Sequence, residues 1–557
     1  MNKLIIMNKQ ISIAIALFFC TVLLGAISCV QSEKLVKSTT ELASPNTKLV
    51  NPTVESKKPN IIYILADDLG IGDLSIYNED SKISTPNLDL MGKEGMKFTD
   101  AHTSSSVCTP TRYGILTGRY NWRTPLKSFV TWGNSPSLIR KGRLTVAQML
   151  KDKGYKTANI GKWHLGFNWT MKDGSTEYEH FSHLNDRVAF PKIDYSQPLK
   201  FGPTDLGFDY SYALAASLNM PPFVYLENDK ATQIPTKKSE QKRADFPYSS
   251  WIKGAISDDF VHDQVLPTFV DKTISYIKEN ANSEQPFFVY LPLPAPHNPV
   301  LPIAPWEGTS GINGYADFVL MIDDLMGQIF KTIKEQGIEE NTLVIFTSDN
   351  GVSTTANIAL LKRNGHNPSY IYSGIKGSYL EGGHRVPFLV KWPKMIPANS
   401  VSDATICTTD FMATCADIVD YTFKDNEAED SFSMLPLLTQ KGEYLREATI
   451  HHSKTGVFAI RKGDWKLIMS PNSGTDAKGR PAKIKKKDKD LPEEILYNLK
   501  TDVAEEKNVA EKYPEKVAAL KALLIEQIKT GRTTPGAAQE NDPTTMDWPQ
   551  AKFSIQD

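Results

Sequence analysis

Short, wholly apolar segments alternate with segments of helical spacing along most of this chain, and this alternation limits the possible folds. Residues 61–65, with the sequence IIYIL, form a continuous apolar run, the pattern of a strand buried on both faces of a parallel sheet. Similar runs at 286–291 and 342–347 are separated by helical patterns at 263–280 and 315–336. Repeated strand–helix units predict an α/β fold with a large, mostly parallel sheet sandwiched by helices.

The α/β domain is predicted to cover residues 58–425. Its remaining elements are expected as two strands, at 156–160 and 388–392, and three helices, at 88–96, 144–153 and 408–419.

Two regions depart from the strand–helix pattern. Residues 170–255 are rich in Pro, Asn, Asp and Tyr and are predicted as a long irregular insertion, a kind of loop that is usually functional or mobile. Over residues 426–557 we predict a smaller C-terminal α+β domain, an antiparallel sheet with a helix against it. Its expected strands are 448–452, 455–461 and 465–469, and its helix is 515–529.

The first residues have the pattern of an export signal. Lys3 and Lys9 precede an apolar run at 11–27, which is short for a membrane span and ends in small residues. We therefore expect a signal peptide over 1–28. A flexible tether rich in Ser, Thr, Lys and Asn is expected at 29–57.

The expected cleavage site leaves two outcomes open. Ala26-Ile27-Ser28-Cys29 can be a lipobox, in which Cys29 is lipidated and retained at a membrane. The small side chains of Ala26 and Ser28 also allow ordinary cleavage after Ser28. We expect an exported protein, either periplasmic or anchored as a lipoprotein in the outer membrane, including at the cell surface.

The overall charge gives no argument for a polyanionic partner. Lys and Arg number 63 against 64 Asp and Glu, so nucleic acid is not expected as a partner. Any anionic substrate must be attracted locally. The five cysteines are too few and too scattered for a disulfide scaffold, and no disulfide is expected at Cys108.

Oxygen-bearing side chains follow two of the predicted strands. Asp67 and Asp68 come after the first apolar run, and Asp349 and Asn350 after the last of the three runs named above. Ligands of open α/β sheets bind at the carboxyl ends of strands. Four such side chains would suit a hard cation, Ca²⁺ or Mg²⁺, rather than a metal that prefers His or Cys. Each pair taken alone could equally be carboxylates that cap a loop.

A single cysteine stands where a helix is expected to begin. In the segment Cys108-Thr109-Pro110-Thr111-Arg112, Thr109 can cap the helix and Pro110 suits its first turn. A side chain here faces free backbone amides, the positive end of the helix dipole and the Arg112 guanidinium, so the place suits an anion. The alternative for a lone cysteine is a small buried apolar residue.

The extended motif resembles that of a known family. Cys108-x-Pro110-x-Arg112 followed by Leu116-Thr-Gly-Arg119 is similar to the signature of the type I, formylglycine-dependent sulfatases of the alkaline-phosphatase-like superfamily. The chain also resembles secreted bacterial polysaccharide sulfatases. In this family a maturation enzyme oxidises the cysteine to formylglycine (3-oxoalanine). The resemblance therefore implies formylglycine at position 108 and one Ca²⁺ held by Asp67, Asp68, the modified Cys108, Asp349 and Asn350.

The resemblance also implies roles for five basic residues. Lys162 and His164 lie two residues apart and would face the same way on an extended segment. Arg112, Lys162 and Lys376 would hold the sulfuryl oxygens. His297 or Lys376 would protonate the leaving alcohol. His164 would take a proton from the second hydroxyl of the hydrated aldehyde, which expels sulfate.

The implied activity is that of a sulfuric ester hydrolase acting on a sulfated carbohydrate. The expected substrate is an algal polysaccharide such as ulvan, carrageenan or fucoidan, or a glycosaminoglycan. The expected partners are this sulfated oligosaccharide or polysaccharide and the formylglycine-generating maturation enzyme. Two alternatives stay open: a phosphatase or phosphonate hydrolase on the same fold, and a surface lipoprotein that binds sulfated glycan without turnover.

Overall fold

The computed structural model describes residues 57–175, 192–240, 250–470, 493–543 and 548–554. The predicted signal peptide, the candidate lipid site at Cys29 and the tether up to residue 56 lie outside the described residues. Within the described part, no helix combines the length and the apolar character needed to cross a membrane.

The first apolar run of the sequence lies at the centre of the large sheet, as strand β1 (Asn60–Asp67). It pairs in parallel with β11 (Thr342–Ser348) on one side and with β10 (Phe287–Pro296) on the other. Beyond β10 follow β4 (Lys156–Lys162) and β5 (Tyr210–Leu214), also in parallel. The predicted α/β fold is confirmed.

Antiparallel pairs occur toward the two edges of this sheet. The strands outside the parallel centre are β13 (Ser400–Ser402), β2 (Met96–Phe98), β12 (Phe388–Lys391), β6 (Leu226–Glu227) and β7 (Lys230–Ala231). In the described residues the order is β13-β2-β12-β11-β1-β10-β4-β5-β6-β7. Because β12 is antiparallel to both β11 and β2, and β6 to both β5 and β7, the sheet is mixed outside its parallel centre.

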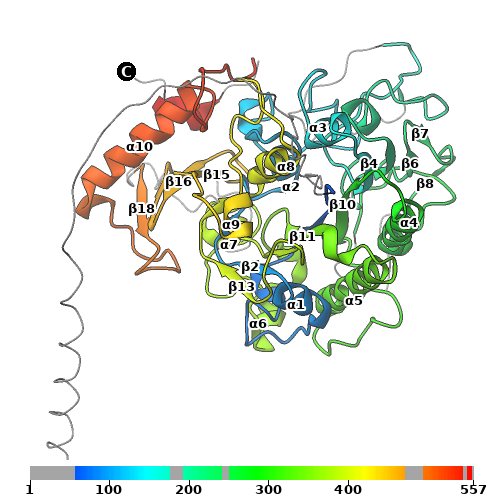
Figure 1. Ribbon diagram of the computed structural model, residues 1–557, viewed down its shortest axis with the longest axis horizontal. Coiled ribbons are helices and arrows are strands. Elements are labelled where there is room, and N and C mark those ends of the chain that lie inside the picture. Colours follow the sequence, from blue (N-terminus) through cyan, green and yellow to red (C-terminus); the bar gives the residue numbers. More distant parts are fainter. Residues whose placement is uncertain (1–56, 176–191, 241–249, 471–492, 544–547, 555–557) are drawn as a thin grey trace, which may run out of the picture. The chain divides into compact units, whose positions relative to one another are not determined.

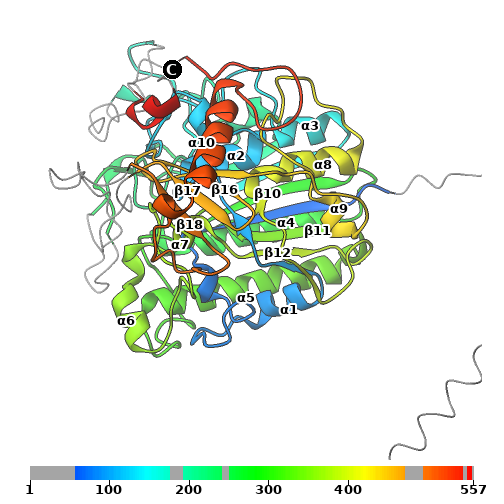
Figure 2. The ribbon, with the colours of Figure 1, turned by 90° about the vertical axis from the view of Figure 1, so that its left-hand side faces the viewer.

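Helices cover both faces of the sheet (Figures 1 and 2). One layer contains α1 (Pro86–Lys93), α4 (Val265–Asn280) and α5 (Gly314–Glu335), and the other α2 (Cys108–Thr117), α3 (Val146–Asp152) and α8 (Phe411–Val419). Local signals set several of their ends. Asn313 and Thr145 cap the starts of α5 and α3, and Gly118, with φ 62°, ends α2.

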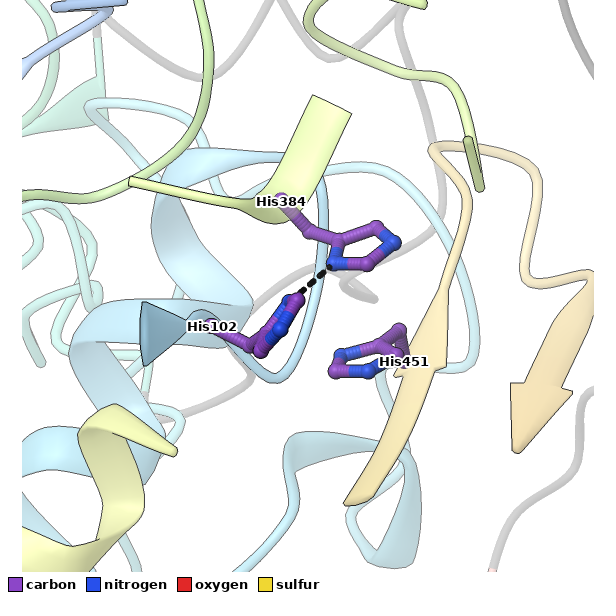
Figure 3. A group of neighbouring side chains, drawn as sticks. All are labelled: His102, His384 and His451. Atoms are coloured by element: carbon purple, nitrogen blue, oxygen red, sulfur yellow. Dashed lines mark hydrogen bonds between the residues drawn. The ribbon is translucent and has the colours of Figure 1, made fainter. Parts of the chain in front are cut away.

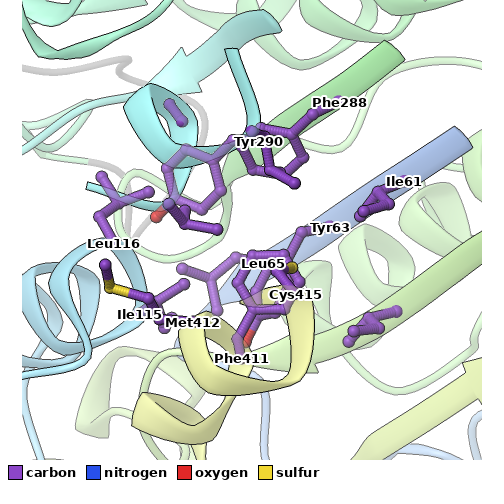
Figure 4. Close-up of a cluster of buried hydrophobic side chains, with 14 of the residues drawn as sticks. Ile61, Tyr63, Leu65, Ile115, Leu116, Phe288, Tyr290, Phe411, Met412 and Cys415 are labelled. Atoms are coloured by element: carbon purple, nitrogen blue, oxygen red, sulfur yellow. The ribbon is translucent and has the colours of Figure 1, made fainter. Parts of the chain in front are cut away.

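Alternate residues of β1 face the two layers. Ile61, Tyr63 and Leu65 pack with α2 and α8, where the ring centroids of Tyr63 and Phe411 lie 4.4 Å apart (Figure 4). The intervening residues of β1 pack on the opposite face with α1, α4 and α5. Burial on both faces explains why this run is apolar throughout.

The prediction of an irregular insertion at 170–255 is wrong for part of its length. β5 lies inside it and pairs with β4, and β6 and β7 extend the sheet from there. A further pair is formed by β8 (Lys237–Lys238) and β9 (Ala255–Ile256). β5 has five residues in a turn-rich context, so its strand conformation depends on pairing with β4 more than on local pattern.

The small C-terminal sheet and its helix are confirmed (Figure 1). The sheet is an antiparallel meander of β15 (Thr449–His452), β16 (Phe458–Lys462), β17 (Trp465–Ile468) and β18 (Ile495–Asn498). α10 (Pro514–Lys529) packs against it through Leu520, Leu524 and Ile528, one face of a helix. The sequence pattern does not predict β18. Further short elements are β3 (Ala101–His102), β14 (Ile406–Cys407), α6 (Ile358–Arg363), α7 (Glu381–His384) and α9 (Leu435–Thr439).

Candidate active site

Two strand ends bring four oxygen-bearing side chains together. Asp67 and Asp68 lie at the carboxyl end of β1, and Asp349 and Asn350 follow its parallel neighbour β11; all four are buried. Asn350 Nδ2 donates to Asp68 Oδ1 at 2.7 Å, and the Asp68 backbone N–H donates to Asp349 Oδ1 at 3.3 Å. The structure therefore places the four residues predicted from the two strand ends in one cluster.

Several oxygen atoms of this cluster are buried without a hydrogen-bond partner. Among the described residues these are Asp67 Oδ1, Asp68 Oδ2 and Asn350 Oδ1. Burial and the negative charge of Asp67 raise the pKa of Asp349. A hard divalent cation would ligate the free oxygens and offset the repulsion between the carboxylates, so these residues fit Ca²⁺.

Three basic side chains predicted to hold sulfate contact the acidic residues of this cluster. The contacts are Lys162 Nζ to Asp67 Oδ2 at 2.5 Å, Lys376 Nζ to Asp68 Oδ1 at 2.5 Å, and Arg112 Nη2 to Asp349 Oδ2 at 2.7 Å. Burial acts to raise the pKa of Asp67. The charge of Lys162, together with those of His297, Arg112 and Lys376, nevertheless holds this pKa well below the usual range. Positive charge is thus concentrated where an anionic group would bind.

Cys108 is the first residue of α2 and is buried beside the same cluster. Its Sγ, a carboxylate oxygen of Asp67 and one of Asp349 all lie within 4.8 Å of one another. Burial raises the pKa of the thiol, against the opposing effect of Lys162 and Lys376. An unmodified thiol here therefore stays protonated and is a weak nucleophile.

The loop after β4 approaches the start of α2. The predicted capping role of Thr109 is wrong, because the helix begins at Cys108 and its N-cap is Val107; the Thr109 hydroxyl instead donates to the His164 carbonyl oxygen at 2.9 Å. The prediction that Lys162 and His164 share one extended segment is also wrong. β4 ends at Lys162, and His164, with φ 55°, has the left-handed backbone conformation that turns the chain.

The His164 imidazole is buried with one nitrogen free. Its Nε2 lies 2.9 Å from the carbonyl oxygen of Thr131, which can only accept, so Nε2 carries the proton. Nδ1 then has a lone pair, for which the described residues provide no hydrogen bond. Burial and the positive charges of Lys162 and Arg112 hold the pKa of His164 well below its usual value. The ring is therefore neutral, and Nδ1 is a weak base unless negative charge binds beside it.

His297 follows β10 and lies near Asp68, with Nε2 at 3.7 Å from Asp68 Oδ2. Its Nδ1 is 2.5 Å from the carbonyl oxygen of Asn298 and 3.2 Å from Ser217 Oγ. Burial and the charge of Lys376 lower the pKa of His297 to about 4. Ser217 carries no sequence signal, because it lies just after β5 in the region predicted as irregular and belongs to no motif.

A second buried cluster lies where β3 and α7 meet β15 of the small sheet (Figure 3). His102 on β3 and His384 on α7 have their Nδ1 atoms 3.0 Å apart, and His451 on β15 stacks on His384 with ring centroids 4.0 Å apart. Every ring nitrogen of the three has a hydrogen-bond partner among the described residues. Since no ring nitrogen is left over for a metal, we interpret this cluster as structural.

Charged side chains extend the second cluster. Lys466 on β17 is fully buried, and its Nζ lies 3.0 Å from Glu381 Oε1, 2.8 Å from Glu505 Oε1 and 3.0 Å from His384 Nε2. One ammonium group therefore bridges two buried carboxylates, and Arg385 and Arg461 add positive charge at Glu381.

Replacing Lys466 by methionine is expected to lower the free energy of unfolding by about 3–5 kcal/mol, because Glu505 would stay buried without its cation and Glu381 would keep only Arg385 and Arg461. The control is Lys462→Met on the neighbouring strand. Its half-exposed pair with Glu447 should contribute less than about 1 kcal/mol. Urea unfolding followed by tryptophan fluorescence compares the two variants, and equal losses in both would contradict this interpretation.

Comparisons with known proteins identify relatives along most of the chain. A family model described as Sulfatase matches residues 59–421, a range that contains Cys108 and all the other site residues predicted from the sequence. A Bacteroides thetaiotaomicron protein named N-acetylgalactosamine-6-O-sulfatase is 32% identical over 509 residues, covering 85% of this chain and 94% of the relative. Human arylsulfatase A is 29% identical over 494 residues, covering 84% and 88%.

A solved structure is also similar. It comes from work on the metabolism of multiple glycosaminoglycans by Bacteroides thetaiotaomicron and is 31% identical in sequence. The TM-score is 0.72, and the match covers 85% of this chain and 99% of the other.

Proposed function

The chain belongs to the sulfatase family of sulfuric ester hydrolases, and on this basis we propose that it removes the 6-O-sulfate of N-acetylgalactosamine in glycosaminoglycan fragments. The observation that carries the proposal is the 32% identity to a relative named N-acetylgalactosamine-6-O-sulfatase, over 94% of that relative's length. Among the substrates expected from the sequence, this similarity favours a glycosaminoglycan over an algal polysaccharide.

A Ca²⁺ site is part of the proposal, and its protein ligands would be Asp67, Asp68, Asp349 and Asn350. The support is the set of buried oxygen atoms that lack a partner in the described residues. Calcium bound there would acidify a hydroxyl on residue 108 and offset negative charge on the sulfuryl group. Lys162 and Lys376, no longer needed to neutralise the carboxylates, would donate to the sulfuryl oxygens.

Formylglycine at position 108, made by a maturation enzyme, would supply the nucleophile. Its hydrate carries two hydroxyl groups on one carbon. One hydroxyl would lose its proton and attack sulfur; an O–S bond would form while the bond from sulfur to the leaving alcohol oxygen breaks, and that oxygen would take up a proton. The second hydroxyl would then lose its proton, the C=O bond would re-form, and the bond from carbon to the sulfate oxygen would break. The unmodified Cys108 carries a single S–H group and no second group that could expel sulfate, so it could not complete this cycle.

Each of the two steps needs a proton transfer, and the site has a candidate for each. Nδ1 of His164, which has no hydrogen-bond partner in the described part of the chain, would take the proton of the second hydroxyl. The leaving alcohol needs a proton in the first step, and two groups beside Asp68 are candidates. Lys376 is protonated at neutral pH, because the charge of Asp68 outweighs burial and raises its pKa. His297, whose pKa is about 4, would act as the acid only once the negative charge of the bound sulfuryl group raises that pKa.

The two histidine variants are expected to fail at different steps. His297→Ala should slow the first step by about 10²- to 10⁴-fold on sugar sulfates, which have poor leaving groups, and far less on 4-nitrophenyl sulfate. His164→Ala should release about one equivalent of alcohol in a burst and then stall as a sulfated enzyme. Rapid-quench kinetics with both substrates, combined with mass spectrometry of the intact enzyme, measures the two effects. A His164 variant without a burst, and equal sensitivity of both variants to the leaving group, would contradict these roles.

The substrate proposal is tested by measuring sulfate release from a panel of defined sugars by ion chromatography. We expect kcat/KM for N-acetylgalactosamine-6-sulfate to exceed that for the 4-sulfate and for carrageenan oligosaccharides by at least about tenfold, or about 1.4 kcal/mol. A preference for carrageenan oligosaccharides would overturn the glycosaminoglycan assignment. Faster hydrolysis of 4-nitrophenyl phosphate than of any sulfate ester would instead support the phosphatase alternative.

Export is proposed on the sequence pattern alone. We propose that the N-terminal signal directs the protein out of the cytoplasm and that Cys29 carries a lipid at the outer membrane. Metabolic labelling with a radioactive fatty acid should mark the wild-type protein and not Cys29→Ala. Unlabelled wild-type protein in the soluble periplasmic fraction would favour ordinary cleavage after Ser28.

A further inference from the structure

The turn between β15 and β16 of the small sheet contacts the loops of the active site. The Lys454 backbone N–H donates to Gly377 O at 3.0 Å, directly after Lys376 in the chain. The Gly377 N–H in turn donates to Ser106 O at 2.9 Å, two residues before Cys108. Two successive backbone hydrogen bonds therefore connect this turn to the loop that carries the nucleophile.

Phe129 lies against the same turn in an unusual backbone conformation. Its N–H donates to Lys454 O at 2.8 Å, and Lys454 Nζ lies 5.7 Å from the centroid of its ring. Its φ is 62°, in the left-handed region, which is strained for a residue with a side chain. Two residues on, Thr131 donates to His164 O at 2.9 Å, so the active site helps to hold this strained loop.

Lys454 is a half-buried cation that pairs with no acidic side chain among the described residues. The other two lysines of the site, Lys162 and Lys376, each contact a carboxylate. Burial and the charge of Lys376 lower the pKa of Lys454, while Cys108 and Asp68 act in the opposite direction. An anion brought in with the substrate would offset this accumulation of positive charge.

We propose that Lys454 and Phe129 form a second subsite of the active site, which binds a sugar ring and an anionic group other than the sulfate that is removed. The exposed part of the Phe129 ring would pack on the apolar face of the sugar. Lys454 would bind the anion, either the carboxylate of a neighbouring uronic acid or a second sulfate. This inference rests on the proposed glycosaminoglycan substrate, whose fragments carry such groups.

The test compares Lys454→Met with the wild type on three substrates: N-acetylgalactosamine-6-sulfate, N-acetylgalactosamine-4,6-disulfate and the chondroitin-6-sulfate disaccharide. Methionine keeps the apolar stem and removes the charge. The disulfate and the disaccharide each carry a second anion. We expect Lys454→Met to raise the KM of one of these two at least about tenfold more than the KM of N-acetylgalactosamine-6-sulfate. A rise confined to the disulfate assigns the site to sulfate, and one confined to the disaccharide assigns it to a carboxylate.

The matched control is Lys153→Met, because Lys153 Nζ lies at the same 5.7 Å from an aromatic centroid, that of Tyr421. It should leave the kinetics on all three substrates unchanged within about twofold. Phe129→Leu should raise KM for the sugars and not for 4-nitrophenyl sulfate. Equal ratios of the KM of Lys454→Met to that of the wild type on all three sugars would overturn the subsite.

A binding measurement separates this inference from the proposed function. Titration calorimetry of Cys108→Ala protein, with and without Lys454→Met, gives the Kd of the disaccharide and of the disulfate without turnover. If wild-type enzyme released sulfate from none of the sugars, the proposed function would fail, and calorimetry would decide the subsite. A tenfold or greater loss of affinity, or about 1.4 kcal/mol, supports it, and an unchanged Kd for both ligands overturns it.

Discussion

Cys108→Ala protein is expected to lose sulfate ester hydrolysis by a factor of at least about 10⁴, because it has no group that can attack sulfur. The acid, the base and the cation site would all remain, so substrate should still bind. Initial rates of sulfate release from N-acetylgalactosamine-6-sulfate, measured by ion chromatography at saturating Ca²⁺, give the size of the loss.

The matched control is Cys415→Ala, since Cys415 is equally buried but lies in the core beside Phe411 (Figure 4). Its activity should stay within about twofold of the wild type, because the change removes one buried atom from the hydrophobic core and no group of the proposed site. Peptide mass spectrometry of residues 104–119 should show the aldehyde in active wild-type protein. Full activity from protein that carries only the unmodified thiol would disprove the role of formylglycine.

The carboxylate cluster could be predicted from sequence because parallel pairing determines where strand ends meet. The runs that become β1 and β11 are buried on both faces, so each can be recognised as a strand from its continuous series of apolar residues. Once both runs are placed in one parallel sheet, the residues after them must lie at the same edge. Asp67, Asp68, Asp349 and Asn350 therefore come together although about 280 residues separate the two pairs.

Other features depend on contacts that have no local sequence signal. β5 is a strand because β4 lies beside it, and only this placement brings Ser217 to His297. The left-handed conformation of His164 is likewise fixed by its surroundings and not by its residue type. Lys454 lies about 80 residues beyond the last site motif and reaches the active site only because the small sheet packs there.

The structure also shows which residues cannot be removed independently. Arg112 is fully buried, and its Nε and Nη2 donate to Asp349 Oδ2 at 3.0 and 2.7 Å. Asp349→Ala would leave this guanidinium buried without its carboxylate, at a cost of roughly 3–5 kcal/mol. Loss of activity in that variant could therefore reflect misfolding. Asp349→Asn keeps an oxygen that can accept from Arg112 and removes the negative charge.

Asp349→Asn is expected to weaken Ca²⁺ binding by about 100-fold, or about 2.7 kcal/mol, because a neutral amide replaces a charged ligand in a site of hard oxygens. Titration calorimetry on chelator-treated protein measures the two affinities. In thermal unfolding, Ca²⁺ at 100 times the wild-type Kd should stabilise the wild type by about 2.7 kcal/mol and the variant by less than about 0.5 kcal/mol.

The control is Asp323→Asn on α5, a buried carboxylate that accepts from Leu88 N and Asn87 N at the start of α1. It should lose stability without any change in Ca²⁺ affinity, because it lies outside the cluster. Full turnover after exhaustive chelation, together with equal Ca²⁺ affinity in wild type and Asp349→Asn, would show that these strand ends hold no catalytic cation.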